Sequence, residues 1–294
     1  MNNRLSVCLG VAVALAASSC AQTREQSAQE PAASGPMVAA PANSAGTMRT
    51  WESVLQGQWR DPKNVARDAY RHPLETLSFF GVQPNHTVIE ITPGSGWYSE
   101  ILAPYLQPQG QYVAAVVDPA AVEEGRAREY QQRGKSGLET KFAAAQAQYG
   151  KARIVGYDPK APSFGAPASA DVVVTFRNVH NWRMANQAEG MFKGFFNVLK
   201  PGGVLGVVEH RAKADVPADD KSGYVGQAQV IAMAEAAGFR LDGSSEVNAN
   251  PQDTKDHPNG VWTLPPVGRH EPADAAKYKA IGESDRMTLR FVKP

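Results

Sequence analysis

Three of the six histidines in the sequence are flanked by residues that could orient an imidazole ring. His180 lies in the string Arg-Asn-Val-His-Asn-Trp, His210 follows Glu209, and His257 follows Asp256. A neutral imidazole acts as a general base near pH 7 when it is within hydrogen-bond reach of the proton that it removes. We therefore identify His180 as the first candidate base, His257 as the second and His210 as the third. The alternative for each is a structural role in a hydrogen-bond network.

A second candidate site is a glycine-bearing turn that follows an apolar run. Residues Val88–Ile91 are typical of a strand buried on both faces, and Gly94 and Gly96 permit positive φ and a close approach of the backbone to a ligand. The helix predicted after the turn leaves unpaired N–H groups at its start. This order favours a phosphate or nucleoside site, although any tight strand-to-helix turn has the same composition.

A carboxylate follows the next predicted strand. The apolar run Gln111–Val117 ends at Asp118. In Rossmann-like sheets an acid at the end of the second strand accepts hydrogen bonds from a ribose diol. The spacing therefore predicts that Asp118 binds a ribose.

These segments resemble the motifs of class I S-adenosylmethionine-dependent methyltransferases, in which an acid precedes a glycine-rich turn and a helix. The segment Glu90-Ile-Thr-Pro-Gly94-Ser-Gly96 follows that motif, with Thr92 where the family usually has its first glycine. Later segments keep the family order, with Asp171–Phe176 as a fourth strand, Leu199–Gly203 before a fifth, and Asp285–Val292 near the end. The strings Thr-Phe-Arg-Asn-Val-His-Asn-Trp and Asp-Thr-Lys-Asp-His-Pro resemble, more narrowly, a group of exported predicted methyltransferases.

The resemblance covers roughly Trp51 to the C-terminus. It implies an α/β fold, a Rossmann-like doubly wound sheet of seven mostly parallel strands with an antiparallel last strand. It also implies S-adenosylmethionine as cofactor, held by Glu90, Thr92, Gly94, Gly96, Asp118, Asp158 and Asn178. By family position Asp158 would accept a hydrogen bond from the adenine amine. The alternative is that Asp158-Pro159 only forms a turn.

The first 21 residues have the order of a secretory signal. Arg4 precedes the apolar run Leu5–Ala17, which is too short to span a bilayer comfortably, and small residues follow. The triplet Ser18-Ser19-Cys20 favours a lipoprotein signal cut before Cys20, whose acylated side chain would tether the protein to a membrane. Ordinary cleavage after Ala21 is the alternative. We expect an exported protein, located in the periplasm or lipid-anchored to a bacterial membrane.

Composition divides the rest of the chain into a tether and one domain. Residues 22–47 are rich in Ala, Pro, Ser, Gly and Gln, a composition that cannot offset chain entropy by burial, and we predict a flexible linker there. Residues 48–294 have room for one large domain. Its chemistry uses oxygen and nitrogen groups, because Cys8 and Cys20 are the only cysteines. A net charge of +1 argues against nucleic acid as a partner.

The predicted strands should bring the polar groups together. Residues 177–182 follow one buried strand and residues 209–211 follow its neighbour, and ligands of open α/β sheets bind outside the carboxyl ends of strands. Helices are predicted at 51–80, 97–106, 119–133, 136–149 and 225–237, with a break at Gly134. Residues 248–284 are too many for a hairpin turn and predict a lid over the strand ends. The alternative is an ordered insertion that covers the sheet.

The sequence therefore predicts an S-adenosylmethionine-dependent methyltransferase acting on an unknown small or lipophilic acceptor. Positioning of donor and acceptor would supply much of the acceleration. One alternative is an exported module that binds a small ligand without catalysis. A less favoured one is a metal-dependent hydrolase, in which the ligands would be His180, His210, Asp253, Asp256 and His257. We assign no metal ligand, because these residues lack a paired ligand spacing.

Overall fold

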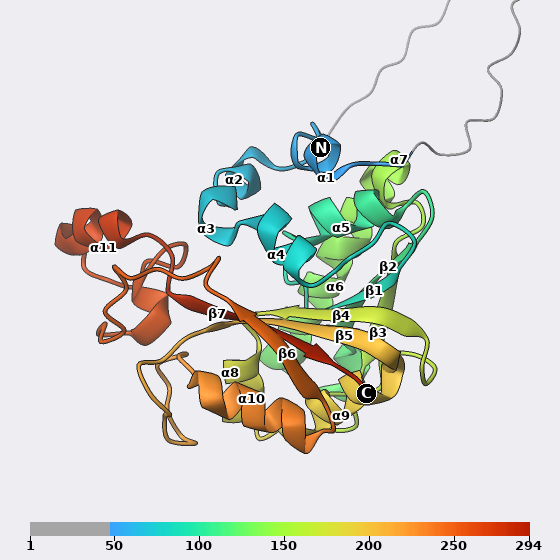
Figure 1. The fold of residues 1–294 in the computed structure, drawn as a ribbon. Coiled ribbons are helices and arrows are strands. Elements are labelled where there is room, and N and C mark those ends of the chain that lie inside the picture. Colours follow the sequence, from blue (N-terminus) through green and yellow to red (C-terminus); the bar gives the residue numbers. More distant parts are fainter. Residues whose placement is uncertain (1–47) are drawn as a thin grey trace, which may run out of the picture. The chain divides into compact units, whose positions relative to one another are not determined.

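The computed structural model describes residues 48–294. The predicted signal sequence and linker lie outside the described residues. Within 48–294, no helix combines the length and the apolar character that crossing a membrane requires. The centre of the fold is a twisted sheet with helices on both faces (Figure 1).

The sheet has seven strands in the order β3-β2-β1-β4-β5-β7-β6. Strands β1 to β5 pair in parallel, whereas β7 runs antiparallel to both β5 and β6. The predicted fold class is confirmed by this order and by the antiparallel last strand. The strands are β1 Thr87–Ile91, β2 Gln111–Val117, β3 Arg153–Tyr157, β4 Ala170–Phe176, β5 Leu199–His210, β6 Arg240–Ser245 and β7 Arg286–Val292.

Helices α1 to α7 lie on one side of the sheet and α8 to α10 on the other, while α11 lies in the connection between β6 and β7 (Figure 1). The helices are α1 Trp51–Leu55, α2 Pro62–Val65, α3 Asp68–Arg71, α4 Pro73–Phe79, α5 Ser99–Leu106, α6 Arg126–Ala144, α7 Gln146–Tyr149, α8 Val179–Met184, α9 Ala188–Val198, α10 Gln227–Ala236 and α11 Ala275–Ile281. Three short 3₁₀ turns are η1 Pro119–Ala121, η2 Gly260–Thr263 and η3 Pro272–Asp274.

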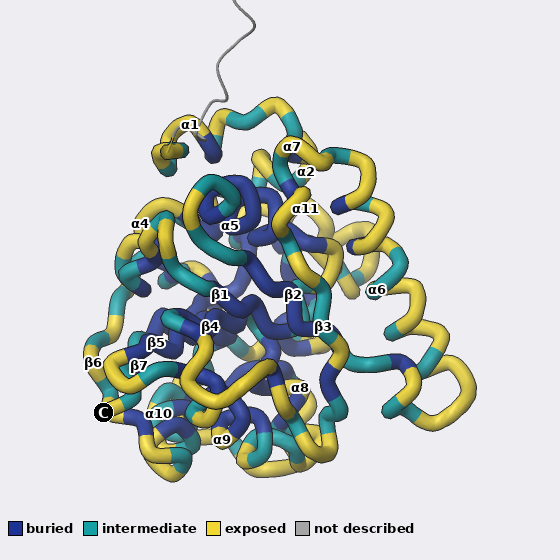
Figure 2. Tube along the Cα trace, turned by 90° about the vertical axis from the view of Figure 1, so that its right-hand side faces the viewer, coloured by how far each residue is buried: buried dark blue, intermediate teal, exposed yellow. Residues whose placement is uncertain are grey.

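The central strands are buried on both faces, as their uninterrupted apolar sequences predict. In β1 the side chains of Ile89 and Ile91 join the core under α8 to α10, while Val88 joins the core under α5 and α6. Successive side chains of a strand point to opposite faces, so one short strand contributes to both cores. Figure 2 shows this buried centre and the exposed outer side of α6.

Several helix predictions were wrong in detail. Residues 51–80 form four short helices, and the left-handed conformation of His72 separates the last two, α3 and α4. Asp61 caps α2 and Pro62 begins it. Helix α5 begins at Ser99, two residues later than predicted, and continues through Pro104 to Leu106. The two helices predicted at 119–133 and 136–149 are instead η1, the continuous α6 and the short α7. Gly134 lies inside α6, since one glycine costs a helix only about 1 kcal/mol.

The long connection between β6 and β7 holds η2, η3 and α11. It returns to the sheet through Asp253, whose buried carboxylate accepts hydrogen bonds from the Tyr224 hydroxyl and the Asp285 N–H. Residues 261–267 of this connection lie near the carboxyl ends of β4 and β5, where they form part of a pocket wall. The connection is therefore ordered and covers this end of the sheet.

Two glycines test the packing of the sheet against its helices. A Cβ atom added to Gly206 of β5 would lie 2.5 Å from the ring of Phe80, whereas one added to Gly137 of α6 would meet nothing within 4 Å. We expect Gly206→Ala to destabilise the fold by about 1–3 kcal/mol, because the buried Phe80 ring has to move. We expect Gly137→Ala to stabilise it by about 0.5–1 kcal/mol. Urea unfolding of both variants measures this, and equal stability of Gly206→Ala and the parent would contradict the packing described.

Candidate active site

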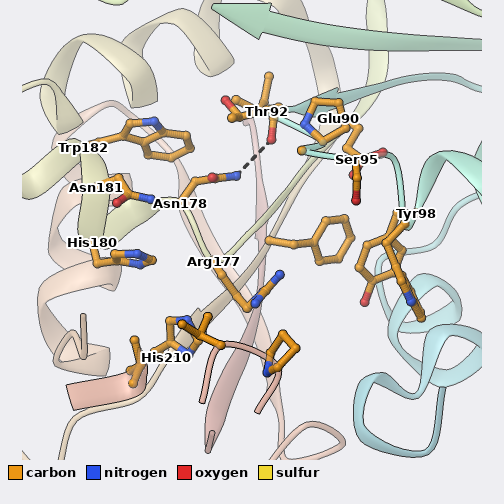
Figure 3. Close-up of a pocket in the computed structure, with 18 of the residues that line it drawn as sticks. Glu90, Thr92, Ser95, Tyr98, Arg177, Asn178, His180, Asn181, Trp182 and His210 are labelled. Carbon is orange, nitrogen blue, oxygen red and sulfur yellow. Dashed lines mark hydrogen bonds between the residues drawn. The ribbon is translucent and has the colours of Figure 1, made fainter. Parts of the chain in front are cut away.

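A pocket of about 630 Å³ lies beyond the carboxyl ends of β1, β4 and β5 (Figure 3). Strand order reverses between β1 and β4, and crevices of open α/β sheets form at such switch points. Four parts of the chain supply most of the wall. They are the turn 92–95 after β1, the segment 176–182 at the end of β4, residues 261–267 of the last connection, and two arginines, Arg71 in α3 and Arg67 just before it.

The turn after β1 presents its backbone to the pocket. Gly94 has φ 61° and a Cβ atom there would meet nothing within 4 Å, so the turn is open on this side. The N–H groups of Gly94 and Ser95 make no hydrogen bond to other described residues. Gly96 instead serves packing, because a Cβ atom there would lie 2.9 Å from Leu138 of α6. Gly94 therefore lines the pocket, whereas Gly96 is not part of its wall.

Thr92 is held in a left-handed conformation, with φ 51°. Its hydroxyl is 2.9 Å from the Tyr157 hydroxyl at the end of β3. Strand β2 lies between β1 and β3, so this hydrogen bond spans the carboxyl end of β2. Tyr157 is 3% exposed, and burial raises its pKa to about 12, which keeps it a neutral partner. Both residues line the pocket.

The two predicted nucleoside acids are engaged in turns. The Asp118 carboxylate accepts a hydrogen bond from the Ala120 N–H at 3.0 Å and so caps η1. The Asp158 carboxylate accepts one from the Lys160 N–H at 2.8 Å. Neither acid lines the pocket. At the ends of β2 and β3 the pocket wall is formed by Val117, Tyr157 and Pro159 instead.

Glu90 is a buried acid at the base of the pocket, 2% exposed. The Tyr112 hydroxyl donates to its Oε2 at 2.5 Å, and the Ser99 hydroxyl is 3.5 Å from the same atom. Burial raises the pKa of Glu90 to about 7, more than these hydrogen bonds lower it. The side chain therefore changes charge near neutral pH.

Asn178 ties two strand ends together. Its side-chain amide donates to the Ile91 carbonyl at 3.0 Å and to the Thr175 hydroxyl at 3.1 Å. It lines the pocket with Thr92 and Gly94, and it fixes the segment after β4 against the turn after β1. The segment it fixes carries His180.

His180 and Glu209 form a buried pair in which the carboxylate orients the imidazole. The Nδ1 atom of His180 is 3.0 Å from Oε1 of Glu209, which is fully buried. The same carboxylate accepts the His180 N–H at 3.2 Å and the His210 N–H at 2.7 Å. Because a carboxylate only accepts, we assign the ring proton to Nδ1, which leaves a lone pair on Nε2. His180 is in the pocket wall, with Trp262 edge-on at 6.0 Å.

His210 lies beside His180, with a ring-centroid distance of 5.3 Å. Its Nδ1 atom is 2.5 Å from the Ser284 hydroxyl. The pKa of His210 is well below its ordinary value, first because of burial and then because His180 and Arg177 are close. His210 is therefore a neutral member of the pocket wall.

His257 lies outside the pocket wall, so the structure separates it from the other two candidate bases. Its Nε2 atom is 2.8 Å from the Asp253 carboxylate, and its ring packs edge-on against Tyr278. Asp253 also anchors the β6–β7 connection through Tyr224. These contacts give His257 a place in a structural network.

Four of the five residues considered as a metal set divide into two groups, while Asp256 instead contacts Thr254 and Lys213. His180 and His210 lie with Glu209, and the three offer ligand atoms within 4.8 Å of one another, whereas Asp253 and His257 belong to the separate anchor of the β6–β7 connection. The Glu209 carboxylate already accepts three hydrogen bonds. The geometry of the first group could hold a divalent ion, but nearby arginines make the site positive, which disfavours one.

Sequence reasoning missed the role of Glu209 and the positive side of the pocket. Glu209 was visible only as part of a polar triplet after a strand. Arg71 and Arg67 come from a segment predicted as helix, in which neither arginine was singled out, and both line the pocket. No pattern in residues 51–80 marks these two arginines, because their position depends on how the four short helices fold back.

No protein-family model and no curated protein matches the sequence. Solved structures do share its backbone arrangement. The [4+2]-cyclase SpnF is 14% identical over 81% of this chain and 86% of its own, with a TM-score of 0.51. A SAM-dependent methyltransferase from Aquifex aeolicus is 14% identical over 84% of this chain and all of its own, with a TM-score of 0.49. The chain therefore has the α/β Rossmann-like methyltransferase fold, and identities this low show the fold alone.

The pKa of Glu90 predicts a pH dependence of stability. Its ordinary value is 4.5 and its value in the folded protein is about 7, so the folded state binds this proton more tightly than the unfolded state. Stability therefore decreases as pH rises from about 4.5 to about 7 and is level above that range, a total of about 3 kcal/mol. Glu90→Gln carries no such charge and should gain stability relative to the parent between pH 5 and pH 8.

Chemical denaturation at pH 5 and at pH 8 tests this prediction. The matched control is Glu129→Gln, which changes an exposed acid on α6 and should keep a constant difference from the parent. A Glu90→Gln variant whose difference from the parent is the same at both pH values would contradict the buried, raised acid.

Proposed function

We propose that the protein is an S-adenosylmethionine-dependent methyltransferase that acts on a small or lipophilic acceptor and uses His180 as general base. One observation carries the proposal. A single pocket is lined both by the glycine turn after β1 and by the histidine that a buried carboxylate orients. The first is suited to a donor and the second to deprotonating an acceptor.

The donor side is fitted to a polar ligand by its backbone. Gly94 leaves open space where a side chain would stand, and the Gly94 and Ser95 N–H groups are unpaired among the described residues. With Thr92, Asn178 and Glu90, these groups would hold the cofactor. S-adenosylmethionine, when bound, supplies an electrophilic methyl group on a sulfonium sulfur. Glu90, with its raised pKa, offers a carboxylate to a positively charged ligand at and above neutral pH.

On the acceptor side, His180 receives the proton. The Nε2 lone pair would take the proton from an O–H, N–H or activated C–H group of the acceptor. The methyl group would pass from the sulfonium sulfur to that acceptor atom, and the donor would leave as a neutral thioether. The Glu209 carboxylate then faces the imidazolium across 3.0 Å and stabilises its charge. Because Glu209 also accepts two backbone N–H groups, the imidazole is held in one orientation throughout.

Aromatic side chains suit an acceptor with an apolar part. Tyr98 and Phe176 stack with 3.5 Å between ring centroids, and both line the pocket. Trp182 and Trp262 belong to the wall as well. Such a wall excludes water and leaves positioning of the two reactants as the main source of acceleration, worth roughly 7–11 kcal/mol in well-oriented reactions.

A second candidate function is binding of a small ligand without methyl transfer. The observation that favours it is the Thr92–Tyr157 hydrogen bond, which crosses the carboxyl end of β2, where the methyltransferase resemblance would place a ribose. Asp118 also turns its carboxylate to the η1 cap. A methyl donor would then have to lie above this hydrogen bond or replace it.

The location of the reaction is part of the proposal. Residues 1–21 are predicted to direct export, with Cys20 as a lipid attachment site, and on that basis the protein works in the periplasm or at a bacterial membrane. An acceptor of lipophilic character is consistent with such a place.

Binding of S-adenosylmethionine decides between the two functions. We expect calorimetry to detect binding to the parent protein and at least about tenfold weaker binding to Gly94→Ala, whose methyl group enters the pocket. Gly202→Ala is the matched control, because Gly202 also has positive φ and open surroundings but lies at the start of β5. Both variants carry similar backbone strain, so only a ligand contact separates them.

Asp118→Ala belongs to the same experiment. If the carboxylate leaves its cap to hold a ribose, affinity falls about tenfold. Unchanged affinity would remove Asp118 from the donor site, and no binding to any form of the protein would refute the methyltransferase function.

The role of His180 predicts a separation of binding from catalysis. We expect His180→Gln to bind S-adenosylmethionine like the parent and to transfer methyl groups about 10²–10⁴ times more slowly, the usual contribution of a general base. Transfer of a labelled methyl group to small molecules and lipids of the cell envelope is the measurement. His257→Gln, which alters the Asp253 network outside the pocket, should keep most of the activity at temperatures where it stays folded. A His180→Gln variant as fast as the parent would exclude His180 as the base.

A further inference from the structure

Arg71 is a buried cation whose hydrogen-bonding capacity is largely unused among residues 48–294. It lies at the end of α3, is 3% exposed and lines the pocket. Its Nε and Nη2 atoms make no hydrogen bond within residues 48–294. The Glu283 carboxylate is 3.6 Å from Nε, beyond hydrogen-bond distance, and the ring of Trp97 is 4.6 Å away. A buried guanidinium left in this state is costly unless a ligand completes its contacts.

Arg177 reaches the same pocket from the end of β4. Its φ is 61°, a conformation that costs a non-glycine residue about 1–2 kcal/mol and that aims its side chain inward. The guanidinium makes no hydrogen bond or ion pair with any residue in 48–294. Figure 3 shows it in the middle of the pocket, between His210 and Tyr98.

The charges around these two arginines do not balance. Glu283 is shared by Arg67 at 2.7 Å, Arg286 at 3.1 Å and, more distantly, Arg71. The pKa of Arg71 is lowered to about 10, first by burial and then by Arg177. Burial and the charge of Arg286 likewise lower the pKa of Arg177. The Glu209 carboxylate also acts on Arg177, but it accepts hydrogen bonds from the His180 ring and two backbone N–H groups. Of the other titratable groups that face the two arginines, His210 and Tyr98 are neutral, and Glu90 is ionised only above about pH 7.

We propose that Arg71 and Arg177 form a subsite for an anionic group, a carboxylate or a phosphate, of the methyl acceptor. Assigning the anion to the acceptor rests on the methyltransferase function proposed above. Arg177 lies next to His210 (Figure 3), and the His210 ring is 5.3 Å from that of His180, so the arginines and His180 share one pocket wall. The anion would therefore lie on the side of the pocket where the acceptor is deprotonated.

The subsite narrows the class of acceptor. The molecule would carry its anionic group toward the arginines, an apolar or aromatic part against Tyr98 and Phe176, and a removable proton near Nε2 of His180. A forked guanidinium matches the paired oxygens of a carboxylate or phosphate, which explains why arginine rather than lysine suits this position.

Thermal unfolding in inorganic phosphate and in sodium chloride of the same ionic strength tests the subsite. We expect phosphate to raise the Tm of the parent and of the control Arg133→Gln, which changes an exposed arginine on α6. Arg177→Gln and Arg71→Gln should each bind phosphate about tenfold more weakly and lose most of that rise. An equal phosphate effect in all four proteins, or none in the parent, would overturn the proposal.

The unfolding temperature of each variant without phosphate shows whether the variant is correctly folded. Arg177→Gln removes one of several like charges and relieves repulsion, so it should unfold at the same temperature as the parent or higher. If it is much less stable, Arg177 is structural, and the Arg71→Gln result then decides whether phosphate binds in the pocket.

The source of the anion is tested with two methyl donors. If the acceptor supplies it, phosphate and S-adenosylmethionine bind together, and Arg177→Gln keeps its affinity for the donor. If the carboxylate of the donor occupies the subsite, phosphate competes with S-adenosylmethionine but not with its decarboxylated analogue, which would overturn the acceptor assignment. If neither donor binds, the methyltransferase function fails, while the phosphate comparison still decides whether the anion subsite exists.

Discussion

The buried carboxylate of Glu209 is the constraint on which the site depends. A fully buried acid is stable only when hydrogen bonds replace its water shell, and here the donors are the His180 ring and two backbone N–H groups. Those groups come from the segment after β4 and from the end of β5. The same interaction therefore joins two strand ends, fixes the orientation of His180 and leaves its second nitrogen toward the pocket.

Charge is distributed around this acid in an uneven way. The Glu209 carboxylate accepts three hydrogen bonds, and the Glu283 carboxylate forms ion pairs with more than one arginine. The pocket therefore keeps a surplus of positive charge. Glu90, on the donor side, supplies negative charge only above about pH 7, because burial raises its pKa to about 7. One side of the pocket is thus built to attract an anion, while the other can accept a cation once Glu90 ionises.

The sequence was sufficient to predict the sheet and the segments that follow its strands. Runs such as Val88–Ile91 and Asp171–Phe176 form strands because the centre of a parallel sheet buries a short apolar run on both faces. The order of the strands then brings Gly94 and His180 to one edge of the sheet. The outward-facing details depended on side-chain partners that a pattern does not contain. Asp118 ends its strand where expected, but the direction of its carboxylate is decided by the nearby Ala120 N–H.

Local breaks were equally hard to predict. Gly134 looked like a helix end, yet the helix continues through it, whereas His72 interrupts a segment that looked continuous. Arg67 and Arg71 lie just before that interruption, and both line the pocket. The hydrophobic pattern of this segment contains no sign of the positive charge that it brings to the site.

The order of the strands also constrains how a newly made chain matures. Strand β6 pairs only with β7, and β7 also pairs with the outer edge of β5. Strand β6 and that edge of β5 therefore remain unpaired until residues 286–292 have been synthesised. Glu283 and Ser284, just before β7, complete the pocket wall. Closure of the sheet is thereby a late event, and a nascent chain that ends before residue 283 lacks both β7 and the last two residues of the pocket wall.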